Sequence, residues 1–519
     1  MAYSPIEDYG MIGDLRTIAL VSMSGSIDFM CFPHYDSPSI FAALLDEKKG
    51  GHFSISPAIE GARQKQLYLP DTNVLVSRFL SEDGVGEVID FMPIGQARHT
   101  HAIVRRVKGI RGPFSFRVEC APRFDYARAD HDVASEDGTI MFRSKGSDGT
   151  VLRLRTSVEM KIEKGNAVAE ITLDGGENVD FVLEVVREGV ETPTGAPEYV
   201  DHAFDQTVSY WRNWIRRSNY KGRWRDMVNR SALVMKLLAS KSTGGIAAAA
   251  TFGLPEMVGG ERNWDYRYTW IRDGSLTTAS LISLGFTEEA ERFVRWIEDR
   301  YEGSADGKLQ IMYGIDGRSD LKEQILDHLE GYKGSSPVRI GNGAYDHLLL
   351  DIYGELMYMI DLYDQHVEPV SYDQWKKLSR SIEWISNHWQ DKDEGIWEVR
   401  GGQQEFLYSR IMAWVALDRA SRIARRRSLP SPLVEWHDTR DRIHEEVYEK
   451  FWNESRKAFI QHKKTDTLDA SALFMPMVGL ISSKDPRWLS TLNEIGKELV
   501  DDSLVYRYRT DTAASDGLA

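Results

Sequence analysis

The hydrophobic period of the sequence changes near residue 203, and this change limits the chain to two kinds of architecture in succession. Up to about residue 200, short segments rich in β-branched and aromatic residues alternate with turn residues, which predicts antiparallel sheet. From there apolar residues recur at helical spacing, beginning with Phe204, Val208, Trp211 and Ile215. We therefore expect a multidomain α and β protein with a β domain first and a helical domain second.

The strand predictions begin with a β-hairpin. Residues Ile18 to Met23 and Ile27 to Phe32 flank the turn sequence Ser24-Gly25-Ser26. Further strands are predicted at 73–79, 86–92, 102–108, 114–120, 152–160 and 179–186. Their spacing is typical of a β-sandwich, and no helix of ordinary length is predicted before Ala203.

The helical part follows a linking helix predicted over 203–224. Helical patterns then cover 225–241, 274–284, 287–301, 345–364, 373–389, 405–424, 432–451, 469–480 and 486–500. The predicted domains are a β-sandwich over 1–202, the linker helix over 203–224 and a helical domain over 225–519. At 519 residues, the chain is long enough for two or three domains.

Charge and cysteine content restrict the partners and the compartment. A net charge of -15 repels phosphate backbones and anionic bilayers, so we expect a small-molecule partner and neither nucleic acid nor membrane. No secretory signal or apolar stretch of about 18 residues is present, which predicts a cytoplasmic protein. Only Cys31 and Cys120 occur, so a disulfide framework is excluded, although one bridge stays open. No sequence signal indicates an oligomeric state.

Several common catalytic sites are absent from the sequence. It contains no P-loop, no HExxH, no CxxC and no GxSxG nucleophile elbow. The run Asp391 to Gly395 is weakly similar to a calcium loop, but its glycine comes one position early and the distal glutamate is missing. We therefore expect neither a metal nor a cofactor.

Aromatic residues stand beside carboxylates and arginines in three predicted loops. A pyranose can stack its apolar face on an indole, and its hydroxyls can form hydrogen bonds with carboxylate and guanidinium groups. Such pairs therefore suit a sugar site. Each tryptophan is equally compatible with core packing. The pairs are Trp264-Asp265, Trp270 with Arg272-Asp273, and Trp397-Glu398.

Glu398 has two interpretations on sequence alone. A glycosidase acid must stay protonated near neutral pH, and contact with the neighbouring indole of Trp397 would favour the protonated carboxyl. Alternatively, Glu398 pairs with Arg400 at the surface.

Five long motifs, in order along the chain, resemble glycoside hydrolase family 15, in particular its bacterial trehalase-like and glucoamylase-like branch. Together they span essentially the whole sequence. They are SGSIDFMCFPHYDSPSIFAALLD, NWDYRYTWIRDGSLT, PVRIGNGAYDHLLLDIYGEL, GIWEVRG and SRIMAWVALDRA.

The resemblance implies a β-supersandwich followed by an (α/α)6 barrel that hydrolyses α-glucosides with inversion. It makes Glu398 the general acid behind the family tryptophan, Trp397. Arg272 and Asp273 are implied to grip the innermost glucose, with Trp264 or Trp270 lining that subsite. Weaker matches are Arg507, similar to an arginine that contacts the same sugar, and three residues that face the site without individual roles: Arg339, Asn342 and Asp351.

The family's general base lies in a late loop downstream of the VYRY motif, and the sequence ends at Ala519 before that loop. We therefore expect a barrel truncated at its C-terminal end, without its base and with impaired hydrolysis. Trehalose is the expected substrate. The alternatives are glucoamylase-type or glucodextranase-type hydrolysis, an inverting disaccharide phosphorylase, in which phosphate replaces the base-activated water, and a non-catalytic sugar-binding fragment.

Overall fold

A computed structural model describes residues 3–59, 61–94, 101–186, 194, 198–301, 306–399 and 402–509. The chain divides into two compact units. The β unit comprises Met1–Ser242, Ala247–Tyr268 and Lys322–Asn342, and the helical unit comprises Thr243–Ile246, Thr269–Leu321 and Gly343–Ala519. Residues 225–242 and two later segments, 247–268 and 322–342, thus cluster with the β unit. The predicted division at residues 202 and 224 stays a prediction.

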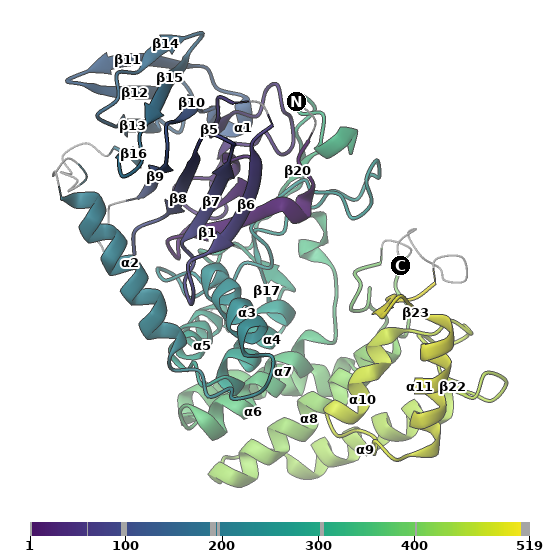
Figure 1. Ribbon diagram of the computed structural model, residues 1–519. Coiled ribbons are helices and arrows are strands. Elements are labelled where there is room, and N and C mark those ends of the chain that lie inside the picture. The colour runs from purple at the N-terminus through teal and green to yellow at the C-terminus, as the bar shows by residue number, and fades with distance from the viewer. Residues whose placement is uncertain are drawn as a thin grey trace. The chain divides into compact units, whose positions relative to one another are not determined.

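The β unit contains two antiparallel eight-stranded sheets (Figure 1). The first sheet has the order β1 (Tyr9–Gly13), β2 (Ile18–Ser22), β3 (Ser26–Cys31), β5 (His52–Pro57), β10 (Phe114–Ala121), β15 (Asn166–Leu173) and β14 (Lys161–Glu163), with β4 (Ser39–Phe41) paired to β3. The second sheet has the order β11 (His131–Glu136), β12 (Thr139–Ser144), β13 (Val151–Arg155), β16 (Asn178–Val185), β9 (Ala102–Arg111), β8 (Val85–Phe91), β7 (Leu75–Leu80) and β6 (Arg63–Tyr68).

The core of the β unit is built by the inward residues of both sheets. Phe53, Ile55 and Val118 of the first sheet join Val107 and Phe181 of the second in one buried cluster. The pattern follows from strand geometry, because alternate side chains point to opposite faces of a sheet. The predicted sandwich is therefore confirmed.

The predicted strands are found with small shifts. The β2–β3 hairpin is confirmed. The strand predicted over 152–160 ends instead at Arg155, because the Thr156 hydroxyl accepts the Val158 N–H in a local turn. Both cysteines are buried and unbonded to each other, so the open possibility of a bridge between Cys31 and Cys120 is removed.

The predicted linker helix begins and ends earlier than expected. Helix α2 runs from Tyr199 to Ile215, and turn formers such as Ser218 and Asn219 follow it. Its apolar face packs against the second sheet in a buried cluster that includes Val104, Val182 and Ala203. Helix α3 (Arg225–Leu238) also belongs to the β unit.

The helical unit has an inner and an outer layer (Figure 1). Inner helices α4 (Ile271–Ser283), α6 (Ile352–His366) and α8 (Leu407–Arg427) pack side by side. Each is followed by an outer helix that packs against it: α5 (Glu288–Tyr301), α7 (Tyr372–His388) and α9 (Leu433–Lys450). Helix α8 is buried on nearly every side, whereas α9 buries a single stripe, as expected for inner and outer positions. The predicted β domain and helical domain are both present.

One helix prediction was wrong in length. The segment 469–480 forms a short 3-10 turn at Ala470–Leu473 and a single helical turn, α10, at Phe474–Met477. Pro476 lacks an amide hydrogen, and Gly479 adopts a left-handed φ of 83°, so the helix ends there. Helix α11 (Pro486–Glu498) follows, close to its prediction.

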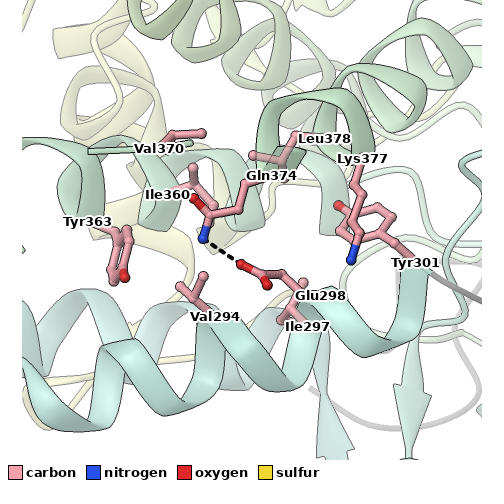
Figure 2. A pocket seen from close by; sticks show the side chains of 10 residues that line it. All are labelled: Val294, Ile297, Glu298, Tyr301, Ile360, Tyr363, Val370, Gln374, Lys377 and Leu378. Atoms are coloured by element: carbon pink, nitrogen blue, oxygen red, sulfur yellow. Dashed lines mark hydrogen bonds between the residues drawn. The ribbon is translucent and has the colours of Figure 1, made fainter. Parts of the chain in front are cut away.

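Helices α5, α6 and α7 meet around a small hollow of about 10 Å³ (Figure 2). Gln374 of α7 donates a hydrogen bond of 2.5 Å to Glu298 of α5 at its edge, beside Val294 and Ile360. Since about 10 to 15 Å³ accommodates a single water molecule, this hollow is a packing feature and no ligand pocket.

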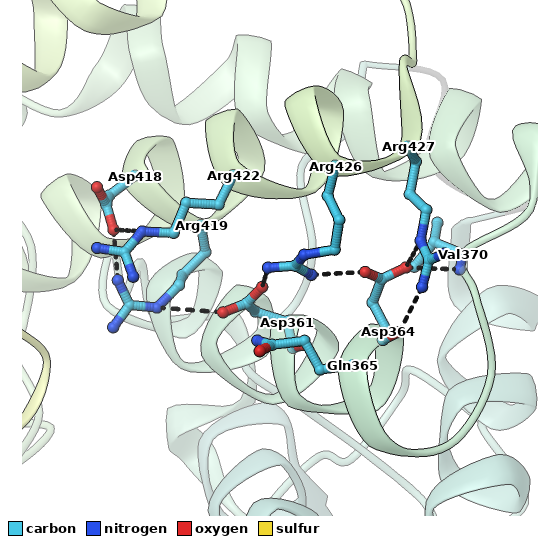
Figure 3. Close-up of polar contacts among 9 residues, drawn as sticks. All are labelled: Asp361, Asp364, Gln365, Val370, Asp418, Arg419, Arg422, Arg426 and Arg427. Atoms are coloured by element: carbon cyan, nitrogen blue, oxygen red, sulfur yellow. Dashed lines mark hydrogen bonds and ion pairs between the residues drawn. The ribbon is translucent and has the colours of Figure 1, made fainter.

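A chain of ion pairs joins α6 to α8 (Figure 3). Arg426 bridges Asp361 at 2.9 Å and Asp364 at 2.6 Å, and Arg427 reaches the other oxygen of Asp364 at 2.8 Å. Burial alone raises the pKa of Asp364, but the Val370 N–H and the two arginines outweigh it and hold the pKa below its usual value. The network fixes the C-terminal halves of the two inner helices to each other.

Candidate active site

The N-terminal end of α4 carries the first group of predicted site residues. Strand β17 (Thr269–Trp270) pairs with β18 (Met312–Tyr313), and the Ile271 N–H donates to the carbonyl of Ile311. These bonds fix the start of the helix, so that Arg272 and Asp273 lie in its first turn.

Glu398 lies in a tight loop between α7 and α8. Its N–H donates to the carbonyl of Gly395 at 2.9 Å, and its φ is 53°. A left-handed backbone is unfavourable for a residue with a Cβ and costs on the order of 1–3 kcal/mol, and such strain clusters at functional sites. The loop therefore holds this carboxyl in one imposed orientation.

Trp270, Arg272 and Glu398 form one hydrogen-bonded group. The Trp270 Nε1–H donates to Oε1 of Glu398 at 2.7 Å, and Nη2 of Arg272 lies 3.3 Å from the same oxygen. Arg272 also donates through Nη1 to the carbonyl of Ile396 at 2.7 Å and through Nε to Asp273 at 3.1 Å. The sequence prediction that these residues share a site is supported by these contacts.

Burial raises the pKa of Glu398 above its ordinary value, which favours the protonated carboxyl. Arg272 and the Trp270 N–H act in the opposite direction, while Asp273 adds to the rise. The indole that reaches Glu398 is that of Trp270, whereas the sequence argument used Trp397. The alternative partner, Arg400, lies outside the described residues.

Trp397 has its own polar partners. Its Nε1–H donates to Oδ2 of Asp469 at 3.0 Å, and the guanidinium of Arg507 lies 5.0 Å from its ring centre. The Ala470 N–H in turn donates to the carbonyl of Arg507 at 2.9 Å. The weak sequence match at Arg507 thus lies next to a tryptophan that precedes the central glutamate.

Asp351, Asp393 and Glu355 are buried carboxyls of the helical unit. Neither oxygen of Asp351 has a hydrogen-bond partner among the described residues. Burial, with Asp393 and Glu398 nearby, raises its pKa to about 7 against the effect of Arg272. The pKa of Asp393 rises to about 6 through burial, although it accepts from Ser409 at 2.7 Å.

Glu355 and Asp393 were missed by the sequence reasoning. Glu355 is buried, accepts the Tyr408 hydroxyl at 2.9 Å and has its pKa raised well above the usual value by burial and by Asp351. A carboxyl four positions after Asp351 on α6 lies on the same helical face, and this spacing was the available signal.

Three predicted residues lie in the β unit. The guanidinium of Arg339 stacks 4.7 Å from the ring centre of Trp264, and Asn342 donates to the backbone carbonyl of Asp265 at 3.2 Å. Asp265 itself makes a buried two-point ion pair with Arg267, at 2.8 and 2.6 Å. The motif NWDYRYTWIRDGSLT is therefore divided between the two units after Tyr268. The site geometry described above belongs to the helical unit alone.

Within the described ranges, no group of three His, Cys, Asp or Glu side chains is placed to hold a metal ion. In those same ranges no helix is both long and apolar enough to cross a membrane. The helical unit offers the largely buried carboxyl of Glu398, whose pKa is raised and which contacts an indole and a guanidinium. Such a group can deliver a proton to a leaving oxygen.

Comparisons with known proteins agree with this chemistry. The family model described as glycosyl hydrolases family 15 matches residues 222–518, and the model of the trehalase-like N-terminal domain matches residues 2–211. A trehalase of Mycolicibacterium smegmatis is 35% identical, over 100% of this chain and 80% of that protein. A trehalase of Thermoplasma volcanium is 34% identical, over 99% of this chain and 82% of that protein.

The fold is also similar to that of a solved structure. A bacterial glucoamylase complexed with acarbose superposes with a TM-score of 0.73 at 12% identity, over 98% of this chain and 81% of that chain. At this identity the likeness supports the fold, a sheet domain followed by a helical domain, and nothing finer.

Proposed function

Because this chain belongs to glycosyl hydrolase family 15, we propose that it hydrolyses trehalose to glucose, with Glu398 as the general acid. The observation that carries the proposal is the partly exposed Glu398 carboxyl with its raised pKa, held by Trp270 and Arg272. The names of the related trehalases support the choice of substrate.

The geometry supports one oxygen of Glu398 as the proton donor. Oε1 already accepts N–H groups from Trp270 and Arg272, so the proton resides on Oε2. In the reaction Oε2–H protonates the glycosidic oxygen as its bond to C1 breaks. The carboxylate that forms keeps both N–H donors on Oε1, which stabilise the new negative charge.

Arg272 and Asp273 are proposed to hold the glucose whose C1 is attacked. Asp273 is partly exposed and accepts only one Arg272 nitrogen in the described contacts, so its carboxylate can take sugar hydroxyls. Trp397, which is partly exposed, offers an indole face to the sugar ring, whereas the buried Trp270 acts through its N–H on Glu398. The sugar-binding roles predicted for Trp264, Arg339 and Asn342 stay predictions.

Inversion requires a second carboxylate about 6.5 to 9.5 Å from the acid, which deprotonates the attacking water. The buried free thiols of Cys31 and Cys120 support the further proposal of a reducing, cytoplasmic setting.

The test of the proposed function is the Glu398→Gln variant. We expect kcat for trehalose to fall by about 10² to 10⁴-fold, because the amide cannot supply the proton, while KM changes little. Unchanged turnover would remove Glu398 from the mechanism. Parallel assays with maltose and isomaltose, and with added phosphate and detection of glucose 1-phosphate, separate trehalose hydrolysis from the glucoamylase and phosphorylase alternatives.

A further inference from the structure

The β unit contains a polar hollow, formed by residues outside the proposed catalytic group. Its volume is about 330 Å³, within the range of about 300–1,000 Å³ found for ligand pockets. The hollow lies over β3, β5 and β10, on the face of the first sheet that is turned away from the sandwich core. We call it the sheet hollow, and its polar lining includes Tyr9, Asp28, Ser54, Ser56, Arg117 and Glu119.

Strand alternation explains why this face is polar. On β5, Phe53 and Ile55 enter the sandwich core, so Ser54 and Ser56 point to the other face. The strand register then brings polar residues together, because directly paired residues lie on the same face. Ser54 pairs with Ser26 on one side and Glu119 on the other, and Ser56 pairs with Arg117. These polar residues face away from the sandwich core, so packing of the core does not account for them.

A β-bulge places a carboxyl in the sheet hollow. In the β2–β3 pairing Leu20 opposes Phe29 and Val21 opposes Ile27, so Asp28 is the extra residue. Bulges re-aim side chains and are frequent beside binding sites. The Tyr9 hydroxyl donates to Asp28 at 2.8 Å, and the Ser26 hydroxyl donates to its other oxygen at 2.5 Å.

The groups that remain available in the sheet hollow suit a polyol. The side chains of Ser54 and Ser56 are partly exposed and that of Arg117 is exposed, and none of the three makes a side-chain hydrogen bond among the described residues. Glu119 accepts from Asn166 at 2.9 Å and keeps a second oxygen, 3.8 Å from His52. Hydroxyl donors, carboxylate acceptors and a guanidinium are the groups that hydrogen-bond vicinal hydroxyls.

The aromatic walls and the charge of the sheet hollow restrict the chemical class of its ligand further. Tyr3 and Tyr9 supply aromatic rings at one side, and Tyr3 is held by an edge contact with Tyr332 at 5.4 Å. Rings of this kind pack against the apolar face of a pyranose. Among the lining residues, the carboxylates of Glu47 and Glu119 outnumber the guanidinium of Arg117, which disfavours anionic ligands such as phosphorylated sugars.

We propose that the sheet hollow binds one pyranose ring of a neutral saccharide, as a second sugar site in the β unit. This site does not depend on Glu398 or on turnover, so it stands independently of the proposed function. Its ligand is a free sugar or the end of a glucoside, both of which present the same ring.

The test is equilibrium dialysis of the whole chain with radiolabelled glucose, which hydrolysis does not consume. We expect Ser54→Trp, which fills the sheet hollow, to bind one glucose fewer per chain at saturation than the unaltered protein. Thr172→Trp is the matched control, because Thr172 is exposed on β15 and pairs with Ser115 outside the hollow. It should bind as much glucose as the unaltered chain.

Arg117→Ala provides a milder variant, expected to weaken this binding event about fivefold to tenfold through the lost hydrogen bonds. Circular dichroism melting curves confirm that each variant is folded. Equal glucose stoichiometry in Ser54→Trp and the unaltered chain, or equal losses in Ser54→Trp and Thr172→Trp, would overturn the proposal. Failure of the proposed function is seen separately, as absence of trehalose hydrolysis in the unaltered chain.

Discussion

The indole nitrogen of Trp270 lies 2.7 Å from Oε1 of Glu398, although 128 positions separate the two residues. Trp270 ends a two-residue strand before α4, whereas Glu398 lies in a left-handed turn before α8. The pair therefore joins the entrances of two inner helices. It also gives the proposed acid a donor that favours its ionised form, in opposition to burial.

Replacing Trp270 should shift the pH dependence of the reaction. In Trp270→Phe the ring stays but the N–H is lost, so the pKa of Glu398 rises further and its protonated form persists to higher pH. We expect the alkaline limb of the kcat profile to move upward by about 0.5 to 1 pH unit, with kcat lowered about tenfold. The pH–rate profile on trehalose measures both effects.

Trp397→Phe is the matched control for this shift. Its N–H binds Asp469 at 3.0 Å instead of Glu398, so the alkaline limb should stay where it is in the unaltered chain. If the alkaline limb of the kcat profile falls at the same pH in both variants and in the unaltered chain, the role given to Trp270 is contradicted.

Arg272→Lys should impair catalysis more than a conservative exchange usually does. The guanidinium reaches the Ile396 carbonyl, Asp273 and Glu398 at once, and an ammonium group cannot reproduce this fork. We expect kcat/KM to fall by about 10²-fold. Arg456→Lys, at a surface pair with Glu498, should leave kcat/KM unchanged, and similar losses in both would argue against a specific role.

Asp351 should make the stability of the fold depend on pH. Its pKa is raised from 3.8 to about 7 by burial, so the folded state binds a proton that the unfolded state releases. Its contribution to stability is complete below about pH 4 and is lost as pH rises to about 7. In the unaltered chain the free energy of unfolding should therefore decline by up to about 1.4 kcal/mol per pH unit in this window. We expect Asp351→Asn to remove this decline.

Urea unfolding at several pH values measures this difference between Asp351→Asn and the unaltered chain. Asp373→Asn, at an exposed pair with Lys376, is the control and should retain the pH dependence of the unaltered chain. Parallel stability curves for Asp351→Asn and the unaltered chain would rule out a raised pKa at Asp351.

The ion-pair network between α6 and α8 should contribute to the stability of the helical unit. Removing the carboxyl in Asp364→Ala leaves Arg426 and Arg427 without this partner, and we expect a loss of about 2 kcal/mol. The low pKa of Asp364 means that its contribution is present above the unfolded pKa and is lost as pH falls. Thermal melting at neutral and acidic pH tests both statements, and Asp373→Ala, which should melt like the unaltered chain, is the control.

Periodicity predicted the strong elements and missed the weak ones. Strands such as β10 and β16 alternate large apolar residues and were predicted within one or two positions. Strand β6, with the sequence Arg63–Tyr68, is polar on both faces and exposes much of its surface, so no apolar pattern marks it. Pairing with β7 across six residue pairs forms this strand, and that pairing is a tertiary interaction.

The sequence by itself determined the two domain types, their order along the chain and the family. Apolar spacing reports burial locally, and the long motifs around Arg272 and Glu398 carry the family resemblance. Tertiary structure alone decided which indole reaches Glu398 and which carboxyls have raised pKa values. Both depend on groups brought together from distant positions and on the loss of water around them, so neighbours in the sequence predicted Trp397 where the fold supplies Trp270.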